Sequence, residues 1–221
     1  MPKVPPLTLL VGTGNAHKLE EIARVLATDA LQVVGAGSIP ARIDALEPPI
    51  EETGATFAEN ARLKALGFAA RALRLEAEER PDWVIADDSG LCVDALDGAP
   101  GVRSARYAGE NATDEANNAL LLALLDGVPP ERRDAEFVCV IAAVRLRERA
   151  GPPAVDFCVE GRCRGTIRAA ASGAGGFGYD PLFFVPELGK TFAELPRDAK
   201  NSHSHRGRAL RALRERLVAE S

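Results

Sequence analysis

The feature that most constrains the fold is a change of periodicity in the opening segment, from a strand pattern to a helix pattern and back. Residues 7–13 form a largely apolar run that predicts a buried strand, and the run breaks at Gly14 and Asn15. Apolar residues then recur at helical spacing, at Leu19, Ile22, Ala23 and Leu26. Residues 31–34 predict a second strand, and this alternation is typical of α/β proteins.

The sequence after residue 34 predicts further helices and strands, and its last strands follow one another directly. Thr56 and Glu59 have the spacing of a capping box, which predicts a long helix running toward Glu79. Further strands are predicted at residues 83–86, 137–146 and 154–159, helices at 114–125 and 206–218, and loops at 48–54, 98–109, 173–178 and around Lys200. The last two strands are expected to be antiparallel neighbours joined by a polar turn around Gly151. We therefore expect an α/β fold with a mixed central sheet flanked by helices, in one domain of residues 1–221.

Charge and cysteine usage narrow the class of protein. The 221 residues include 27 Lys and Arg against 32 Asp and Glu, and a net charge of −5 argues against binding a nucleic-acid polymer, which needs a basic face. The four cysteines form no CxxC pair and lie in or beside apolar runs, as expected of reduced, buried thiols. No stretch reaches the roughly 20 apolar residues of a membrane-spanning helix, so we expect no membrane partner and a cytoplasmic protein.

Residues 13–18, Thr-Gly-Asn-Ala-His-Lys, lie where the first strand gives way to the first helix. A helix N-terminus offers amide groups and a positive dipole end to anions, Gly14 lets a phosphate approach the backbone, and Lys18 adds a positive charge. Two nucleotide motifs are excluded, because His17 replaces the third glycine of GxGxxG and no GxxxxGK[ST] occurs. The alternative to a triphosphate site is a plain turn with a surface lysine.

Acidic residues at the ends of elements form a second candidate site. Glu51 and Glu52 precede Gly54 in a loop, and Asp87 and Asp88 close a predicted strand. Catalytic groups of α/β sheets gather at the carboxyl ends of strands, and two carboxylates suffice to hold a Mg²⁺ ion shared with substrate phosphates. Adjacent strand residues face opposite sides, so only one of the two aspartates is expected to enter the site. The alternative is that Asp-Asp-Ser-Gly is only a turn.

A glycine-rich segment, residues 175–181, contains a candidate surface for a base. Glycines flank Phe177, whose ring offers a stacking surface, and Asp180 is available for hydrogen bonds. Stacking does not discriminate between bases, so discrimination is expected from polar groups. The alternative is a hairpin turn.

Residues 200–207 place Lys200, His205 and Arg206 around a predicted helix start, where they suit contacts to a phosphate or a base. His203 and His205 do not indicate zinc, since no cysteine or third histidine is near them in the sequence.

Taken in order, these segments resemble the inosine triphosphate pyrophosphatase family, also called the XTP/dITP diphosphatases. The similarity runs over nearly the whole chain, through residues 13–18, 52–60, 86–91, 98–101, 104–107, 176–181 and 204–207. Each motif alone is weak, but chance does not explain seven in the same order. Two departures from the usual pattern, a longer link at residues 73–81 and the extra His203, leave the motif residues untouched.

The resemblance implies a fold, a partner and a site. Members of that family are homodimers with an elongated, two-lobed α/β fold, and the nucleotide lies in the cleft between the lobes. By motif, Asp88 is the proton acceptor and, with Glu52, a Mg²⁺ ligand, and Ser89 lies beside the substrate. The other implied contacts are Thr13, Gly14, Asn15, Ala16, His17 and Lys18 for the triphosphate, Phe177, Gly178, Tyr179 and Asp180 for the base, and Lys200, His205 and Arg206 for base and phosphate.

The activity that the resemblance implies is hydrolysis of deaminated purine nucleoside triphosphates, ITP, dITP and XTP, to the monophosphate and pyrophosphate. Asp88 would activate a water for attack on the α-phosphorus, while Mg²⁺ and Lys18 stabilise the departing pyrophosphate. Two alternatives stay open. A Maf-type pyrophosphatase acts on pyrimidine or modified nucleotides, but usually starts with Ser-x-Ser-x-x-Arg. A nucleotide sensor would bind without turnover and would need no water-activating base.

Overall fold

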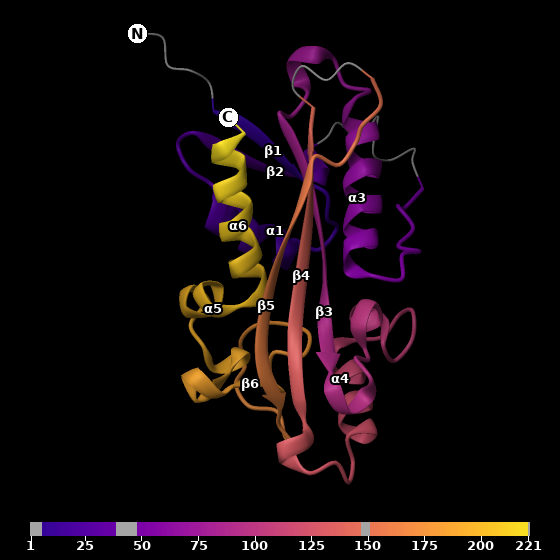
Figure 1. The fold of residues 1–221 in the computed structure, drawn as a ribbon, viewed down its shortest axis with the longest axis vertical. Coiled ribbons are helices and arrows are strands. Elements are labelled where there is room, and N and C mark those ends of the chain that lie inside the picture. Colours follow the sequence, from indigo (N-terminus) through magenta and orange to yellow (C-terminus); the bar gives the residue numbers. More distant parts are fainter. Residues whose placement is uncertain (1–5, 39–47, 147–150, 221) are drawn as a thin grey trace. The chain divides into compact units, whose positions relative to one another are not determined.

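The computed structural model describes residues 6–38, 48–146 and 151–220, and in this part of the chain seven strands form one sheet in the order β2-β1-β3-β4-β5-β6-β7 (Figure 1). The described residues divide into two compact units, a first that lies within Met1–Asp88, Val140–Val159 and Ala209–Ser221 and a second within Ser89–Cys139 and Glu160–Arg208. Three strands contribute to both units: β3 (Trp83–Val93), β4 (Asp134–Arg145) and β5 (Phe157–Ile167). The expected mixed α/β sheet is confirmed.

The first unit opens with the strand–helix–strand segment that the sequence predicts. β1 (Leu7–Val11) pairs in parallel with β2 (Leu31–Gly35), and α1 (Ala16–Leu26) connects them. β1 also pairs in parallel with β3. The first three strands of the sheet therefore run in one direction, as a crossover helix requires.

α3 (Phe57–Ala72) begins as predicted but ends earlier than the sequence suggests. Thr56 Oγ1 accepts from the Glu59 N–H at 3.2 Å and the Glu59 carboxylate accepts from the Thr56 N–H at 3.0 Å, which completes the capping box. The expected extension toward Glu79 is wrong, because the chain turns inward after Ala72 and buries Leu75, which is 4% exposed. Arg80 donates to the Leu75 carbonyl at 2.9 Å and stabilises this turn.

β3 and β5 are longer than predicted. β3 continues through Asp-Asp-Ser-Gly to Val93, because β4 remains beside it where β1 has ended. β5 extends to Ile167 although four of its eleven residues are polar, namely Glu160, Arg162, Arg164 and Thr166. The N–H groups of Asp156, just before β5, and of Ile167, at its end, donate to the carbonyls of residues 143 and 133, so β4 and β5 are antiparallel, as expected. Gly151, in the connection between β4 and β5, forms a bend with φ 111°. Residues 147–150 of this connection lie outside the described part of the chain.

The second unit is built on α4, a short sheet edge and α5. Its elements are α4 (Asp114–Leu124), β6 (Phe183–Val185), β7 (Lys190–Thr191), α5 (Arg197–His203), a 3-10 helix at Gly101–Arg106 and the first turn of α6 (His205–Ala219). β6 pairs antiparallel with both β5 and β7. The loop expected around Lys200 is instead helix α5, whose N-cap is Pro196.

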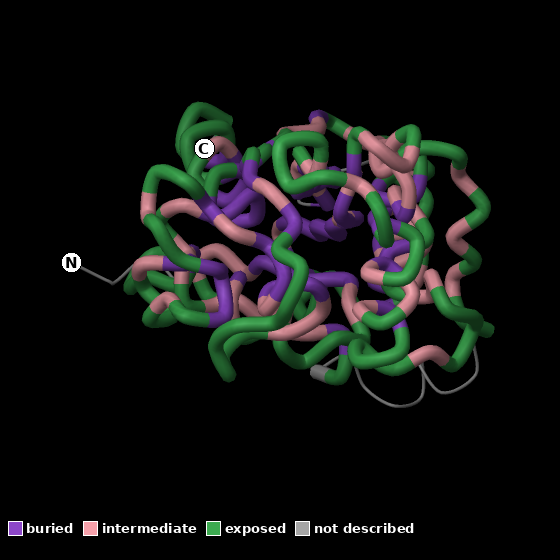
Figure 2. Tube along the Cα trace, turned by 90° about the horizontal axis from the view of Figure 1, so that it is seen from below, coloured by how far each residue is buried: buried purple, intermediate pink, exposed green. Residues whose placement is uncertain are grey.

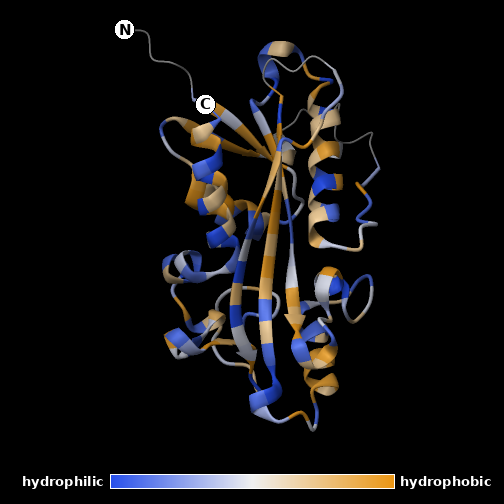
Figure 3. Cartoon of the chain, in the orientation of Figure 1, coloured by the Kyte–Doolittle hydropathy of each residue, from blue (hydrophilic) through white to orange (hydrophobic). Residues whose placement is uncertain are grey.

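Most residues of β3 and β4 are buried, and Figure 2 shows buried segments surrounded by exposed ones. β4 is coloured as hydrophobic over most of its length (Figure 3), and Ile141, Ala142 and Val144 are fully buried. A strand covered on both faces has this continuous apolar pattern. In the second unit, Leu91, Leu121 and Phe183 belong to one apolar cluster and are also fully buried. None of the described helices is both long and apolar enough to cross a membrane.

Candidate active site

The start of α1 presents exposed backbone. Asn15 is the N-cap, and its Oδ1 accepts from the Lys18 N–H at 3.1 Å, while Thr13 Oγ1 accepts from the Asn15 N–H at 3.1 Å. Gly14, Ala16 and His17 are exposed, and a Cβ added at Gly14 would meet no atom within 4 Å. An exposed helix N-terminus suits an anion, and the binding of a triphosphate by residues 13–18 stays a prediction.

The two aspartates lie where β3 continues past the end of β1. Val11, the last residue of β1, is level with Ile85, so Asp87 and Asp88 have no β1 residue opposite them. Lys18 extends into this space, and its Nζ lies 3.1 Å from Asp87 Oδ2. The Asp87 side chain is 1% exposed, so this is a nearly buried ion pair.

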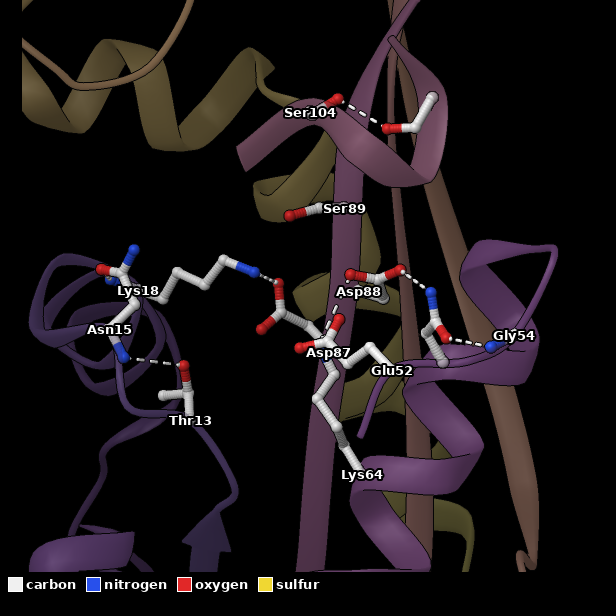
Figure 4. Close-up of polar contacts among 12 residues, drawn as sticks. Thr13, Asn15, Lys18, Glu52, Gly54, Lys64, Asp87, Asp88, Ser89 and Ser104 are labelled. Carbon is white, nitrogen blue, oxygen red and sulfur yellow. Dashed lines mark hydrogen bonds and ion pairs between the residues drawn. The ribbon is translucent and has the colours of Figure 1, made fainter. Parts of the chain in front are cut away.

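Asp88 faces α3 instead (Figure 4). Its Oδ2 accepts from Asn60 Nδ2 at 3.2 Å, and its Oδ1 lies 3.4 Å from Lys64 Nζ. The same ammonium lies 3.0 Å from Glu52 Oε2, so Lys64 joins two carboxylates from separate segments. Alternation along the strand therefore directs Asp87 and Asp88 to different helices, as the sequence predicts.

Asn60 ties this arrangement together and is 1% exposed. Its Oδ1 accepts from the Gly54 N–H at 2.8 Å while its Nδ2 donates to Asp88. A Cβ on Gly54 would lie 2.6 Å from Glu59 Cβ and 2.7 Å from Asn60 Oδ1, so glycine is needed for this close approach. The contact fixes the loop that contains Glu52 against the start of α3.

Burial and charge oppose each other at Asp88 and Lys64. Burial raises the pKa of Asp88, the charge of Glu52 adds to the effect, and the attraction of Lys64 offsets only part of it. For Lys64, burial lowers the pKa, but the negative charges of Asp88, Asp87 and Glu52 outweigh burial and raise it overall. Lys64 is therefore a cation, and Asp88 is more basic than an ordinary carboxylate, as a proton acceptor needs to be.

In the second unit, backbone hydrogen bonds hold both sides of Phe177. Asp180 Oδ2 accepts from the Phe177 N–H at 2.9 Å. Gly178 donates its N–H to Asp114 Oδ2 at 2.6 Å, and its carbonyl accepts from Asn118 Nδ2 at 2.9 Å. Before Phe177, Gly176 has φ 75°, and a Cβ there would collide with the Asp180 carboxylate.

Two cations lie near the Phe177 ring. Lys200 Nζ is 2.6 Å from Asp180 Oδ2 and 4.8 Å from the ring centroid. Arg206 donates to Ser89 Oγ at 2.9 Å, and its Cζ lies 5.7 Å from the same centroid. The second unit thus brings Phe177 together with four other predicted residues, Ser89, Asp180, Lys200 and Arg206.

Two other predicted residues are packed into the interior. His205 is 5% exposed, and its ring stacks on Phe137 with centroids 4.6 Å apart and planes at 9°. Tyr179 is 4% exposed, and its hydroxyl donates to the Ser104 carbonyl at 2.9 Å. Burial raises the pKa of Tyr179, so the phenol stays neutral. Both side chains support the surrounding backbone here, and their contacts with substrate stay predictions.

Sequence reasoning missed Asn60, Lys64, Asp114 and Asn118. Each pair is four residues apart on one helix, so its two members share a face, and this spacing was the available signal. Their hydrogen-bond partners are distant along the chain. Asp88 is 28 residues from Asn60, and Gly178 is 64 residues from Asp114. No local pattern reveals contacts of that range.

Asp88 and Glu52 suit a metal ion that is shared with a substrate. Among the described residues, no group of three or more His, Cys, Asp or Glu side chains is placed to hold a metal ion by itself. Mg²⁺ normally needs only one or two protein carboxylates and completes its shell with waters and phosphate oxygens. Two hard carboxylates that share Lys64 as an ion-pair partner fit this requirement.

The fold of this chain is that of a known protein family. The family model described as the Ham1 family matches residues 9–216, and the chain is a member of the Ham1 family.

Named relatives cover almost the whole chain. A protein of Desulforamulus reducens named dITP/XTP pyrophosphatase is 48% identical over 211 residues, 96% of each chain. A protein of Geobacillus kaustophilus with the same name is 51% identical over 207 residues, 94% of this chain and 92% of that one. The solved structure of a HAM1 protein from Coxiella burnetii has a TM-score of 0.79 at 36% identity, covering 97% of this chain and 100% of that chain. The Ham1 protein of Staphylococcus aureus has a TM-score of 0.77 at 38% identity, with the same coverage.

Proposed function

We propose that this chain hydrolyses deaminated purine nucleoside triphosphates, ITP, dITP and XTP, to the nucleoside monophosphate and pyrophosphate. The observation that supports this most directly is the buried Asp88 carboxylate, held by Asn60 and Lys64 beside Glu52, in a member of the Ham1 family. The close relatives named dITP/XTP pyrophosphatase support the substrate class.

In the proposed reaction, residues of the first unit act on the triphosphate. The amides at the start of α1 and the ammonium of Lys18 bind phosphate oxygens. Asp88 accepts a proton from water, whose oxygen bonds to the α-phosphorus as the bond to the bridging oxygen breaks and pyrophosphate leaves. Asp88 and Glu52 would hold Mg²⁺, which supplies neutralisation of phosphate charge when bound. Lys64 keeps Glu52 and Asp88 close despite their like charges.

Residues of the second unit bind the base. Phe177 offers a stacking surface, and Lys200 and Asp180 supply polar contacts beside it. Donors that face a 6-oxo group would be left unpaired by adenine, which has an amino donor there, and unpaired buried donors are costly. This cost accounts for discrimination against adenine nucleotides.

The proposal includes a homodimer in the cytoplasm. The dimer rests on the family resemblance. The compartment rests on the four cysteines, which all lie in the described part of the chain, form no disulfide there and so fit a reducing environment.

One assay tests the function. The purified protein is incubated with ITP, XTP, dTTP and ATP in Mg²⁺, and pyrophosphate and monophosphate are measured for each. We expect rapid release from ITP and XTP and little from dTTP or ATP. Preference for dTTP would favour a Maf-type enzyme, and tight binding of ITP without any product would favour a sensor; either result contradicts the proposal.

A further inference from the structure

We propose that Asp114 and Asn118 of α4 are positioning residues for Phe177, acting through the backbone of Gly178. The inference rests on the proposed function, because it takes Phe177 as the surface on which the base stacks. Asp114 accepts from the Gly178 N–H at 2.6 Å, and Asn118 donates to the Gly178 carbonyl at 2.9 Å. One helix therefore holds both polar backbone groups of the residue that follows Phe177.

Phe177 needs such restraint because glycines stand on both sides of it. Gly176 and Gly178 have φ of 75° and 62°, and glycine has more backbone freedom than any other residue. The Asp180 carboxylate accepts a hydrogen bond from the Phe177 N–H, and this bond restrains the backbone on the N-terminal side of Phe177. Without the bonds to Gly178, a binding base would have to order the segment after the ring, and ordering a backbone weakens binding.

α4 is itself firmly fixed in the second unit. Asn117, 3% exposed, accepts from the Ala108 N–H at 2.9 Å and donates to the Ala105 carbonyl at 3.2 Å. Leu121, on the next turn, is fully buried in the apolar cluster of this unit. A helix anchored in this way is a rigid support, which precise positioning of a binding residue requires.

Asn118 is poorly explained by a contribution to stability. Within the described part of the chain, its Oδ1 is buried and has no hydrogen-bond partner, in contrast to the fully bonded amide of Asn117. A buried acceptor without a partner destabilises the folded state. The bond from Asn118 Nδ2 to Gly178 is therefore the feature that accounts for an asparagine here.

The main test replaces Asn118 with leucine, which has a similar shape and no polar atoms. We expect KM for ITP to rise about 3- to 10-fold, the equivalent of one neutral hydrogen bond, with kcat changed less than about 2-fold. The thermal midpoint should be unchanged or higher. A purely structural residue would instead lower the midpoint and leave KM unchanged, and an unchanged KM in Asn118→Leu overturns the inference.

Asp114 provides a second, independent variant. Asp114→Ala should raise KM, while Asp114→Asn retains an acceptor oxygen and should restore KM most of the way toward wild type. Glu115→Ala is the matched control, because Glu115 is exposed in the same first turn of α4, while the Gly178 N–H donates to Asp114. If Glu115→Ala raises KM as much as Asp114→Ala, helix charge explains the effect and the inference fails.

A double variant distinguishes this inference from the proposed function. If α4 acts through Phe177, adding Asn118→Leu to Phe177→Ala should raise KM no further than Phe177→Ala alone. A fully additive effect would contradict the coupling. If Phe177→Ala alone leaves KM unchanged, the stacking role in the proposed function fails and this inference fails with it. If Phe177→Ala raises KM but the α4 variants do not, only this inference fails.

Discussion

Lys18 and Asp87 form an ion pair with Nζ 3.1 Å from Oδ2, while the neighbouring Asp88 is joined to Lys64. Two adjacent aspartates on one strand are thus each paired with a lysine from a different helix. Asp87 touches the lysine that is proposed to bind the triphosphate, and Asp88 adjoins the second acidic residue, Glu52. In the proposed reaction, Asp87 therefore positions a cation and Asp88 accepts a proton.

Substitution of the two aspartates by asparagine should have different effects. Asp88→Asn retains the shape and removes the proton acceptor, and kcat/KM for ITP should fall about 10²- to 10⁴-fold. Asp87→Asn should reduce kcat/KM far less, mainly through KM, because Lys18 loses its partner. It should also lower the free energy of unfolding by about 3 kcal/mol, the lower end for a buried pair, because Lys18 keeps some exposure to solvent. Steady-state kinetics and urea unfolding check both variants; an inactive, folded Asp87→Asn with an active Asp88→Asn would reverse the assignment.

Removal of divalent cations should abolish hydrolysis of ITP. Two carboxylates and a lysine near a triphosphate leave phosphate charge to be neutralised, and Mg²⁺ is the ion that this donor set suits. Activity should disappear in excess EDTA and return on titration with Mg²⁺. Glu52→Gln should shift the half-maximal Mg²⁺ concentration upward, and undiminished turnover in EDTA would refute the metal role of both carboxylates.

Phe177→Ala should weaken binding of ITP and XTP to a similar degree, by about 1–3 kcal/mol, because stacking on an aromatic ring depends little on which base is bound. KM should change more than kcat, since stacking contributes equally to the ground and transition states. Phe184→Ala is a useful comparison, because Phe184 lies on β6 beneath Arg168 and outside the proposed base site. A wild-type KM for both nucleotides in Phe177→Ala would show that the ring only shapes a turn.

Asn60→Ala should lower both stability and turnover, because its amide bridges Gly54 and Asp88. Loss of these bonds should cost about 1–3 kcal/mol in unfolding free energy, and kcat/KM should fall about 10- to 100-fold as Glu52 and Asp88 lose their alignment. Asn60→Asp should be worse than Asn60→Ala, since it adds a carboxylate 3.2 Å from Asp88. Asn111→Ala, at an exposed asparagine, is the control. Equal activity in Asn60→Asp and wild type would exclude this role.

Local signals in the sequence were sufficient for several elements. The capping box at Thr56 and Glu59 is a contact between residues three apart, so the start of α3 was readable directly. The helix expected at residues 114–125 matches α4, Asp114–Leu124, whose N-cap Thr113 and acidic first turn are also local features. The opposite orientation of Asp87 and Asp88 followed from strand periodicity alone.

Tertiary contacts overruled local preference elsewhere. Asp-Asp-Ser-Gly has the composition of a turn, yet β3 continues through it because β4 lies alongside. Gly165 weakens the strand pattern in β5, but a Cβ there would lie 2.9 Å or closer to the Phe183 ring, so the glycine reflects packing and not a break in the strand. Lys64 and Asn60 acquire their roles only when α3 packs beside β3, which the sequence does not reveal.

Gly176 shows that intolerance to substitution is no proof of contact with a ligand. Any side chain at this position would displace the Asp180 carboxylate, which binds both the Phe177 amide and the Lys200 ammonium. A single added methyl group would thus disturb an aromatic ring, an ion pair and a left-handed backbone at once. In a saturation-mutagenesis map, position 176 should therefore score as severely as the residues proposed to touch the nucleotide, although glycine has no side chain with which to touch it.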